Sequence, residues 1–135
     1  MKVLTFGVFD LLHIGHVLLF KKIKDVFGED CHLIVAMQED DYIAKYKPST
    51  KMVYTQSERR FMLESVKYVD EVVTYQNVAS DISHFAFDVF VKGPDQSHEG
   101  FRLAEQWCLE QGRKVEIIGR TEGISSSEIR EIRKQ

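Results

Sequence analysis

The sequence predicts a three-layer α/β fold, in which helices cover both faces of a five-stranded, mostly parallel sheet. The main observation is that apolar runs typical of strands alternate with segments of helical periodicity along the whole chain. The second is size: 135 residues, of which 44% are hydrophobic, suit a single domain over residues 1–135 with one core. The third is uniformity, since no repeat, linker or low-complexity segment divides the chain.

Each expected element follows from its local pattern. Apolar runs predict strands at Lys2–Val8, His32–Met37, Val69–Tyr75, Asp88–Lys92 and Val115–Gly119. Helical periodicity predicts helices at Ile14–Phe27, Gln56–Tyr68, Ser80–Phe87, Phe101–Gln111 and Ser125–Lys134. The first helix ends at Gly28, as a C-terminal glycine commonly ends one, and Thr55 or Ser57 is the expected N-cap of the second. The remaining stretch, Tyr42–Thr55, lacks periodicity and predicts a mobile loop.

Composition excludes several classes of protein. The formal net charge of −3 gives no basic excess that would favour nucleic acid or an anionic membrane as partner. No run of about 18 apolar residues predicts a membrane span, and the N-terminus lacks the pattern of a signal peptide. Cys31 and Cys108 lie far apart and outside any C-x-x-C pair, so we expect buried free thiols. These features predict a cytoplasmic protein.

Three loops are expected to meet at the carboxyl ends of the parallel strands, where ligands bind in such sheets. They are Gly7–His16, Gly93–Gly100 and Arg120–Ser127. The first joins a strand to a helix, the usual position of a phosphate-binding loop, but it has neither G-x-G-x-x-G spacing nor the G-K-[ST] of a P-loop.

This first loop carries two histidines instead. His13 and His16 are three residues apart in the first helical turn, so both imidazoles share one face. The unpaired N–H groups and the dipole of the helix N-terminus favour an anion there, and Gly15 lets a phosphate approach the backbone. Two imidazoles at such a turn are suited to the charge stabilisation that phosphoryl or nucleotidyl transfer needs. Two histidines at this spacing also occur as zinc ligands, or as surface residues without a role. The remaining histidines do not have the spacing of further zinc ligands.

Two motifs resemble a known family. The segment G-V-F-D-L-L-H-I-G-H is similar to the signature of the HIGH-motif cytidylyltransferases, and R-T-E-G-I-S-S-S at Arg120–Ser127 resembles their second signature. The resemblance covers essentially the whole chain and is strongest to the glycerol-3-phosphate cytidylyltransferases. It implies a Rossmann-like fold of nucleotidylyltransferase type, a homodimer, and reaction of CTP with a phosphorylated alcohol, assisted by Mg²⁺, to give a CDP-alcohol and pyrophosphate.

The resemblance also implies roles for individual residues. His13 and His16 would contact the CTP phosphates and stabilise the pentavalent transition state, and the catalytic set it implies is His13, His16, Lys47 and Arg120. Lys45 would bind the acceptor. The nucleotide-binding set that it implies is Val8, Phe9, Asp10, Gly15, Arg60, Asp95, Thr121, Gly123, Ile124, Ser125, Ser126 and Ser127. For the family arginine at the start of the helix, Arg59 competes with Arg60.

The chain departs from the family pattern in two segments expected to line the acceptor pocket. A tryptophan is expected after the Asp95 loop, where the chain has Gln96-Ser97-His98, and another in Thr74–Phe87, where Val78 is the nearest position. Glycerol 3-phosphate is therefore the first expectation for the acceptor, and phosphocholine, phosphoethanolamine or another polyol phosphate are alternatives. An adenylyltransferase of the same fold and a non-catalytic nucleotide-binding module are the competing functions.

Overall fold

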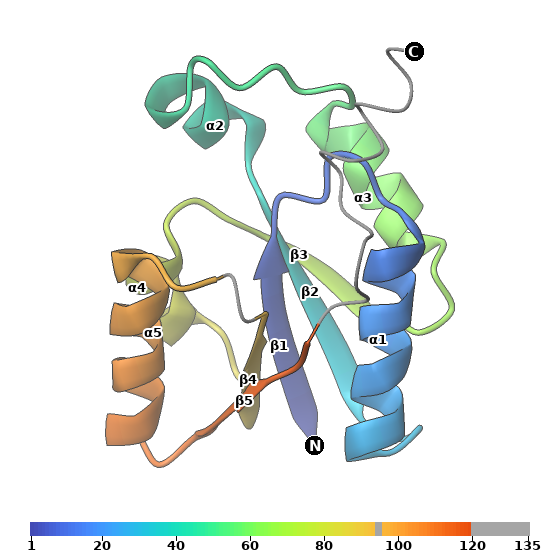
Figure 1. Cartoon of the computed structure of the whole chain (residues 1–135), viewed down its shortest axis with the longest axis vertical. Helices are drawn as coiled ribbons and strands as arrows, with labels where there is room; N and C mark the ends of the chain where they lie inside the picture. Colours follow the sequence, from blue (N-terminus) through green and yellow to red (C-terminus); the bar gives the residue numbers. More distant parts are fainter. Residues whose placement is uncertain (94–95, 120–135) are drawn as a thin grey trace.

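The computed structural model describes residues 1–93 and 96–119, and these form one α/β sandwich, as expected. The strands are β1 (Lys2–Gly7), β2 (His32–Gln38), β3 (Glu71–Tyr75), β4 (Val89–Lys92) and β5 (Lys114–Ile117). The helices are α1 (Ile14–Phe27), α2 (Asp40–Tyr46), α3 (Gln56–Glu64), α4 (Val78–Asp81) and α5 (Glu99–Glu110), with the 3-10 turn η1 (Ile82–His84). Helices α1 and α3 cover one face of the sheet and α4 and α5 the other (Figure 1).

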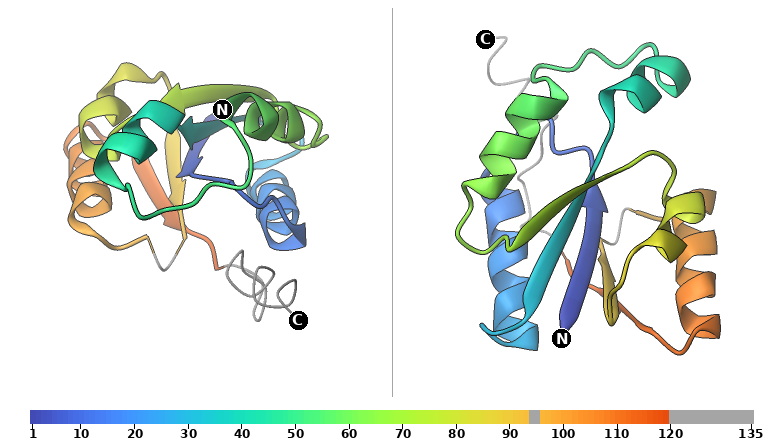
Figure 2. Two further views of the ribbon diagram at one scale, coloured as in Figure 1. Left: turned by 90° about the horizontal axis from the view of Figure 1, so that it is seen from above. Right: turned by 180° about the vertical axis from the view of Figure 1, so that it is seen from behind.

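All the described strand pairs are parallel, and the strand order is β3-β2-β1-β4-β5. The chain adds β2 and β3 on one side of β1 and then crosses to the other side for β4 and β5. The order therefore switches at β1, and ligands of open parallel sheets bind beyond the carboxyl ends of the strands at such a switch. Helix α2 lies beyond that edge of the sheet (Figures 1 and 2).

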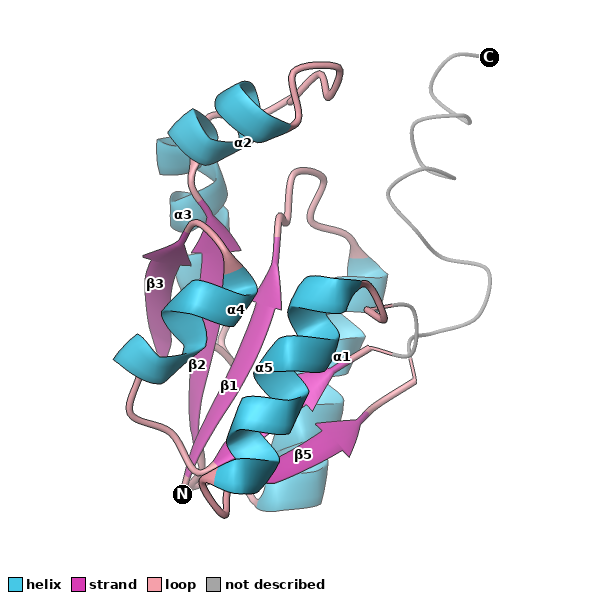
Figure 3. Cartoon of the chain, turned by 90° about the vertical axis from the view of Figure 1, so that its left-hand side faces the viewer, coloured by secondary structure: helices cyan, strands magenta, loops and turns pink. Residues whose placement is uncertain are grey.

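The sheet is buried on both faces, which explains why its strands are continuous apolar runs rather than alternating ones. Side chains from successive β1 residues enter opposite layers. The layer under α1 and α3 includes Val3, Phe20, Ile23, Leu33, Val35, Leu63 and Val91. The layer under α4 and α5, which face the viewer in Figure 3, includes Leu4, Phe6, Ile34, Ala36, Phe90, Phe101 and Ala104.

The two cysteines are buried and free, as the sequence predicts. Cys31 packs in the layer under α1, and Cys108 packs in the layer under α5. Burial raises the pKa of the Cys108 thiol to about 11, so this thiol stays protonated at neutral pH and behaves as a small apolar side chain. No helix in the described part of the chain is both long and apolar enough to cross a membrane.

The structure corrects three of the expected elements. In place of the helix expected at Ser80–Phe87 it has the four-residue α4, which begins earlier, and then the 3-10 turn η1, which ends at His84. Asp40–Tyr46 is a helix, although the sequence predicts a loop from Tyr42. This seven-residue helix depends on tertiary contacts with Gln56. The Asp40 N–H donates to the Gln56 side chain at 2.8 Å, and the Asp40 carboxylate accepts from the Gln56 N–H at 2.7 Å. Periodicity within the segment alone carries no sign of these contacts.

The third correction concerns α3, which ends at Glu64 rather than at Tyr68. Ser65 ends the helix, and its hydroxyl donates to the Phe61 carbonyl at 2.8 Å. Val66, Tyr68 and Val69 still pack on the core, so the apolar stripe continues past the last helical residue. The N-cap is Thr55, which forms a capping box with Glu58. The expected C-terminal helix Ser125–Lys134 lies outside the described residues.

An ion pair joins α1, β2 and the start of β3 at the edge of the sheet that lies opposite α2. The buried Lys24 amine donates to the Cys31 carbonyl and to the Asp70 carboxylate. The same carboxylate accepts from the Leu33 N–H at 2.8 Å. Burial alone would raise the pKa of Asp70, but the hydrogen bonds from Lys24 and Leu33 and the charge of Lys24 outweigh it and lower this pKa below 3.8.

We expect Asp70→Asn to lower the free energy of unfolding by about 1–2 kcal/mol at neutral pH, because Lys24 loses its charged partner. Since the Asp70 pKa is depressed, its contribution is complete above pH 3.8 and is lost as the pH falls through the folded-state pKa. Urea unfolding at several pH values should therefore show that the variant and the wild type approach the same free energy of unfolding in acid. The control Asp25→Asn, in the exposed Lys21–Asp25 pair, should change stability by less than about 0.5 kcal/mol; equal losses would contradict this assignment.

Candidate active site

The loop between β1 and α1 has a constrained backbone. Phe9 has a φ of +57°, in the left-handed region that residues other than glycine rarely adopt. Its ring lies on Gly7, where an added Cβ would sit 2.6 Å from the Phe9 Cζ atom, so this position requires glycine. The Phe9 ring also contacts the His16 imidazole edge-on, with centroids 5.4 Å apart. The strained residue thus supports one of the two histidines.

His13 and His16 form a capping box at the start of α1. The His13 Nδ1 atom accepts from the Gly15 N–H at 3.0 Å, and the His16 Nδ1 atom accepts from the His13 N–H at 3.2 Å. The two rings stack with centroids 4.0 Å apart. Because Nδ1 accepts in both rings, this hydrogen-bond pattern assigns the neutral tautomer with the proton on Nε2. In this tautomer each imidazole carries its proton on Nε2, and an N–H group of this kind can donate to a phosphate oxygen.

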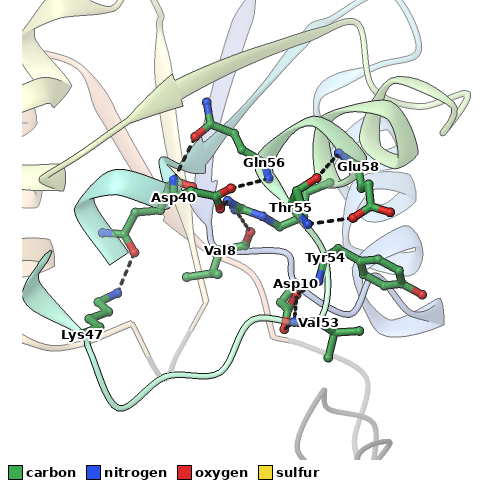
Figure 4. A network of polar contacts seen from close by, with 11 residues as sticks. Val8, Asp10, Asp40, Lys47, Val53, Tyr54, Thr55, Gln56 and Glu58 are labelled. Carbon is green, nitrogen blue, oxygen red and sulfur yellow. Dashed lines mark hydrogen bonds and ion pairs between the residues drawn. The ribbon is translucent and has the colours of Figure 1, made fainter. Parts of the chain in front are cut away.

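Asp10 connects the first loop to the segment before α3. Its carboxylate accepts from the Val53 N–H at 3.0 Å and from the Tyr54 N–H at 2.9 Å (Figure 4). The residue is buried, and these bonds span more than forty positions of the sequence. Among the contacts in the described residues, Asp10 thus fixes a loop, a role that the resemblance to the family does not assign to it.

Arg59 is the largest fully buried side chain of the described residues, and it lies under the site. Its Nη1 atom donates to the carbonyls of Val8 and Gln38, both at 2.8 Å, and its Nη2 atom bonds to the Asp40 carboxylate. The guanidinium thereby joins the carboxyl ends of β1 and β2 to the start of α2. Figure 4 shows Val8, Asp40 and Gln56 gathered around this point.

Arg60, for which the family resemblance implies nucleotide binding with Arg59 as the alternative, lies away from the first loop. Its guanidinium donates to the Val72 carbonyl at 2.8 Å and lies 3.8 Å from the exposed Glu64 carboxylate. The structure brings Arg59, and not Arg60, to the first loop. The spacing of α3 carries a signal for this, since Arg59 precedes the buried Leu63 by four residues and so shares its face.

The two loop lysines differ in their surroundings. Lys45 lies on α2, where its amine is 5.2 Å from the centre of the Tyr46 ring. Lys47 has an exposed stem, but its amine reaches inward and donates to the Gln38 Oε1 atom at 2.6 Å. Burial of that amine lowers the pKa of Lys47 below its usual range. An anion beside it would favour the charged form and be bound in return.

A pocket of about 280 Å³ opens beyond the carboxyl ends of the strands, between α2 and the N-termini of α4 and α5. Its lining residues are Gly7, Val8, Gln38, Tyr42, Lys47, Tyr75, Asn77, Val78, Gln96, His98, Gly100 and Phe101. Among the residues that the structure describes, this set contains the amine of Lys47 and no carboxylate. It also unites Val78 with Gln96 and His98, the two segments in which the sequence departs from the family pattern. The structure thus brings these separate departures into one pocket.

The sites predicted for Asp95, Arg120, Thr121, Gly123, Ile124, Ser125, Ser126 and Ser127 lie outside the described residues. Within the described ranges, no group of three or more His, Cys, Asp or Glu side chains is arranged to hold a metal ion. The carboxylate nearest in sequence to the histidines, Asp10, holds backbone N–H groups.

Comparison with known proteins identifies the family. A family model described as Cytidylyltransferase-like matches residues 4–132. The chain belongs to this family. It is 35% identical over 133 residues to the glycerol-3-phosphate cytidylyltransferase of Bacillus subtilis (strain 168), covering 96% of this chain and 95% of that protein. It is 31% identical to the FAD synthase of Aciduliprofundum boonei, covering 87% of this chain and 76% of the relative.

A solved structure shares the fold. The lipopolysaccharide core biosynthesis protein of Thermoplasma volcanium aligns with a TM-score of 0.68 and 23% identity, over 90% of this chain and 96% of that one. Together the comparisons make the chain a cytidylyltransferase-like nucleotidyltransferase. The two relatives are named for different reactions, so family membership does not by itself specify the acceptor.

We expect Arg59→Lys to lower the free energy of unfolding by about 2–4 kcal/mol, because one ammonium group replaces the planar fork that reaches two carbonyls and Asp40. Arg60→Lys is the matched control, and it should cost less than about 0.5 kcal/mol at its partly exposed position. Urea unfolding measures both. Similar losses in the two variants would show that the Arg59 contacts are not specific.

Proposed function

We propose that this chain transfers CMP from CTP to glycerol 3-phosphate, giving CDP-glycerol and pyrophosphate. The observation that carries the proposal is the donor-rich pocket that opens beside the first loop, whose described lining residues include no carboxylate. The R-T-E-G-I-S sequence from Arg120 and the similarity to glycerol-3-phosphate cytidylyltransferases over almost the whole chain support CTP as the nucleotide.

In the proposed reaction, the triphosphate of CTP lies at the N-terminus of α1, against the Nε2–H groups of His13 and His16. An oxygen of the acceptor phosphate attacks the α-phosphorus, forming the new P–O bond as the bond to pyrophosphate breaks. Both histidines donate to the phosphate oxygens whose charge grows in the transition state. Since their rings are fixed by the cap and by Phe9, little reorganisation accompanies the step. Arg120 would add positive charge to the leaving group.

The pocket chemistry supports a phosphorylated polyol as the acceptor. The Lys47 amine bonds to Gln38 and has further N–H groups to offer an anion. The Asn77 amide donates to the Tyr42 hydroxyl at 3.2 Å, which leaves the hydroxyl proton and the second amide hydrogen as donors for a ligand. An acceptor with a cationic ammonium group, such as phosphoethanolamine, would find no carboxylate among the lining residues within 1–93 and 96–119. The pocket therefore favours hydroxyl groups over amines.

We also propose two properties that the resemblance implies and one that the composition predicts. Mg²⁺ would enter bound to the CTP phosphates and water, supplying positive charge to them. The active form would be a homodimer, which sedimentation measurements can test. We place the reaction in the cytoplasm, the compartment that the sequence predicts.

The proposal is tested by measuring pyrophosphate release with CTP and with ATP, each against glycerol 3-phosphate, phosphocholine, phosphoethanolamine and FMN. We expect turnover with CTP and glycerol 3-phosphate, and at least about tenfold lower kcat/KM with the amine acceptors. The similarity to FAD synthase supports the competing adenylyltransferase, for which exclusive use of ATP would be the result. CTP binding without turnover of any acceptor would instead indicate a non-catalytic module.

We expect His16→Ala to lower kcat by about 10²–10³-fold while the Kd for CTP changes much less, because the imidazole donates most strongly to charge that develops in the transition state. Steady-state kinetics and calorimetric CTP binding measure the two effects. His32→Ala is the control, since His32 pairs with Glu71 at the far end of the sheet. Equal losses in kcat and CTP affinity would assign His16 to binding alone.

A further inference from the structure

We propose that His98 determines the specificity for the acceptor, and that its Nε2–H group donates a hydrogen bond to a hydroxyl of the phosphorylated polyol. The inference rests on the function proposed above and adds a residue to it. His98 lines the pocket from the N-terminus of α5, on the side of the sheet opposite α1 and its two histidines.

The His98 ring is held in one orientation by three contacts. It caps α5, and its Nδ1 atom accepts from the Gly100 N–H at 3.1 Å. Its ring packs edge-on against Phe101, with centroids 4.5 Å apart. It also lies over the Cα atom of Gly100, where an added Cβ would come within 2.9 Å of the His98 Cε1 atom. Glycine at this position therefore makes room for the imidazole.

This orientation determines what the ring offers. Because Nδ1 accepts the capping hydrogen bond, the neutral ring carries its proton on Nε2. Within the described residues no acceptor for that Nε2–H group is found, and the side chain is exposed to solvent at the pocket. A fixed donor that has no acceptor among the described residues can bind a ligand hydroxyl at little cost in side-chain entropy.

The direction of the reaction indicates which end of the acceptor meets His98. The attacking phosphate must face the α-phosphorus of the nucleotide, which the proposed function puts at the first loop. The polyol end then extends away from α1, toward Asn77 and His98 at the starts of α4 and α5. Gln96 does not compete for this role, since its amide donates to the Phe6 carbonyl at 3.0 Å and accepts from the Gly93 N–H.

The test compares glycerol 3-phosphate with two analogues that each lack one hydroxyl, propane-1,2-diol 1-phosphate and propane-1,3-diol 1-phosphate. The variant His98→Asn keeps a side-chain oxygen for the α5 cap and removes the imidazole donor. In the wild type, at least one analogue should have a kcat/KM about tenfold below that of glycerol 3-phosphate. In His98→Asn that penalty should shrink to about twofold, while the KM for CTP stays unchanged.

Two further variants separate specificity from folding. His84→Asn makes the same chemical change at an exposed histidine of η1 outside the pocket lining and should preserve the wild-type penalties. Gly100→Ala should displace the His98 ring and reproduce the loss of discrimination. Thermal unfolding verifies that each variant is folded.

The outcomes distinguish this inference from the function on which it rests. Failure of the wild type to turn over any acceptor with CTP overturns the proposed function. A wild type that uses both analogues as well as glycerol 3-phosphate, or a His98→Asn variant that keeps the full penalties, overturns only the role of His98. A preference for an amine acceptor overturns both, since an N–H donor repels an ammonium group.

Discussion

The geometry of the site depends on the buried guanidinium of Arg59. Burying a charge is costly, and here the cost is offset by two backbone carbonyls and the Asp40 carboxylate. Those partners belong to the first loop, to the end of β2 and to the start of α2. Through Asp40 the same network includes Gln56, at the first turn of α3. One side chain thus sets the spacing of four segments on which the candidate site is built.

Asp10 provides a second constraint on the geometry of the site. The Asp10 carboxylate holds the backbone at Val53 and Tyr54 against the first loop, so the chain between α2 and α3 cannot move independently of the histidines. The strand switch at β1 then separates the two halves of the site. The histidines occupy the α1 side, whereas the pocket lies on the side of α4 and α5, and the lysine amine lies between α2 and the sheet. This arrangement suits a reaction between two phosphates that approach from opposite sides.

The sequence predicts correctly the features that depend on residues close together in the chain. The bounds of α1 match because an apolar stripe, a capping turn and Gly28 all lie within one segment. The order of strands and helices follows from alternation, as does burial of both sheet faces. The length of α3 and the existence of α2 could not be predicted, because Ser65 and the Asp40–Gln56 pair act through contacts that periodicity does not report. The spacing of Arg59 to Leu63 indicates that Arg59, rather than Arg60, lies on the buried face of α3. The contact of Asp10 could not be predicted, because it joins two distant loops.

The central claim is that an acceptor phosphate attacks the α-phosphorus of CTP in this site. The most direct measurement uses glycerol 3-phosphate labelled with ¹⁸O at its three terminal phosphate oxygens, with unlabelled CTP, and analyses the products by ³¹P NMR. The account predicts that the label enters CDP-glycerol, including the oxygen that bridges its two phosphorus atoms, and that pyrophosphate is unlabelled. A product without label in the bridging position, or hydrolysis of CTP with no label transferred, would contradict it.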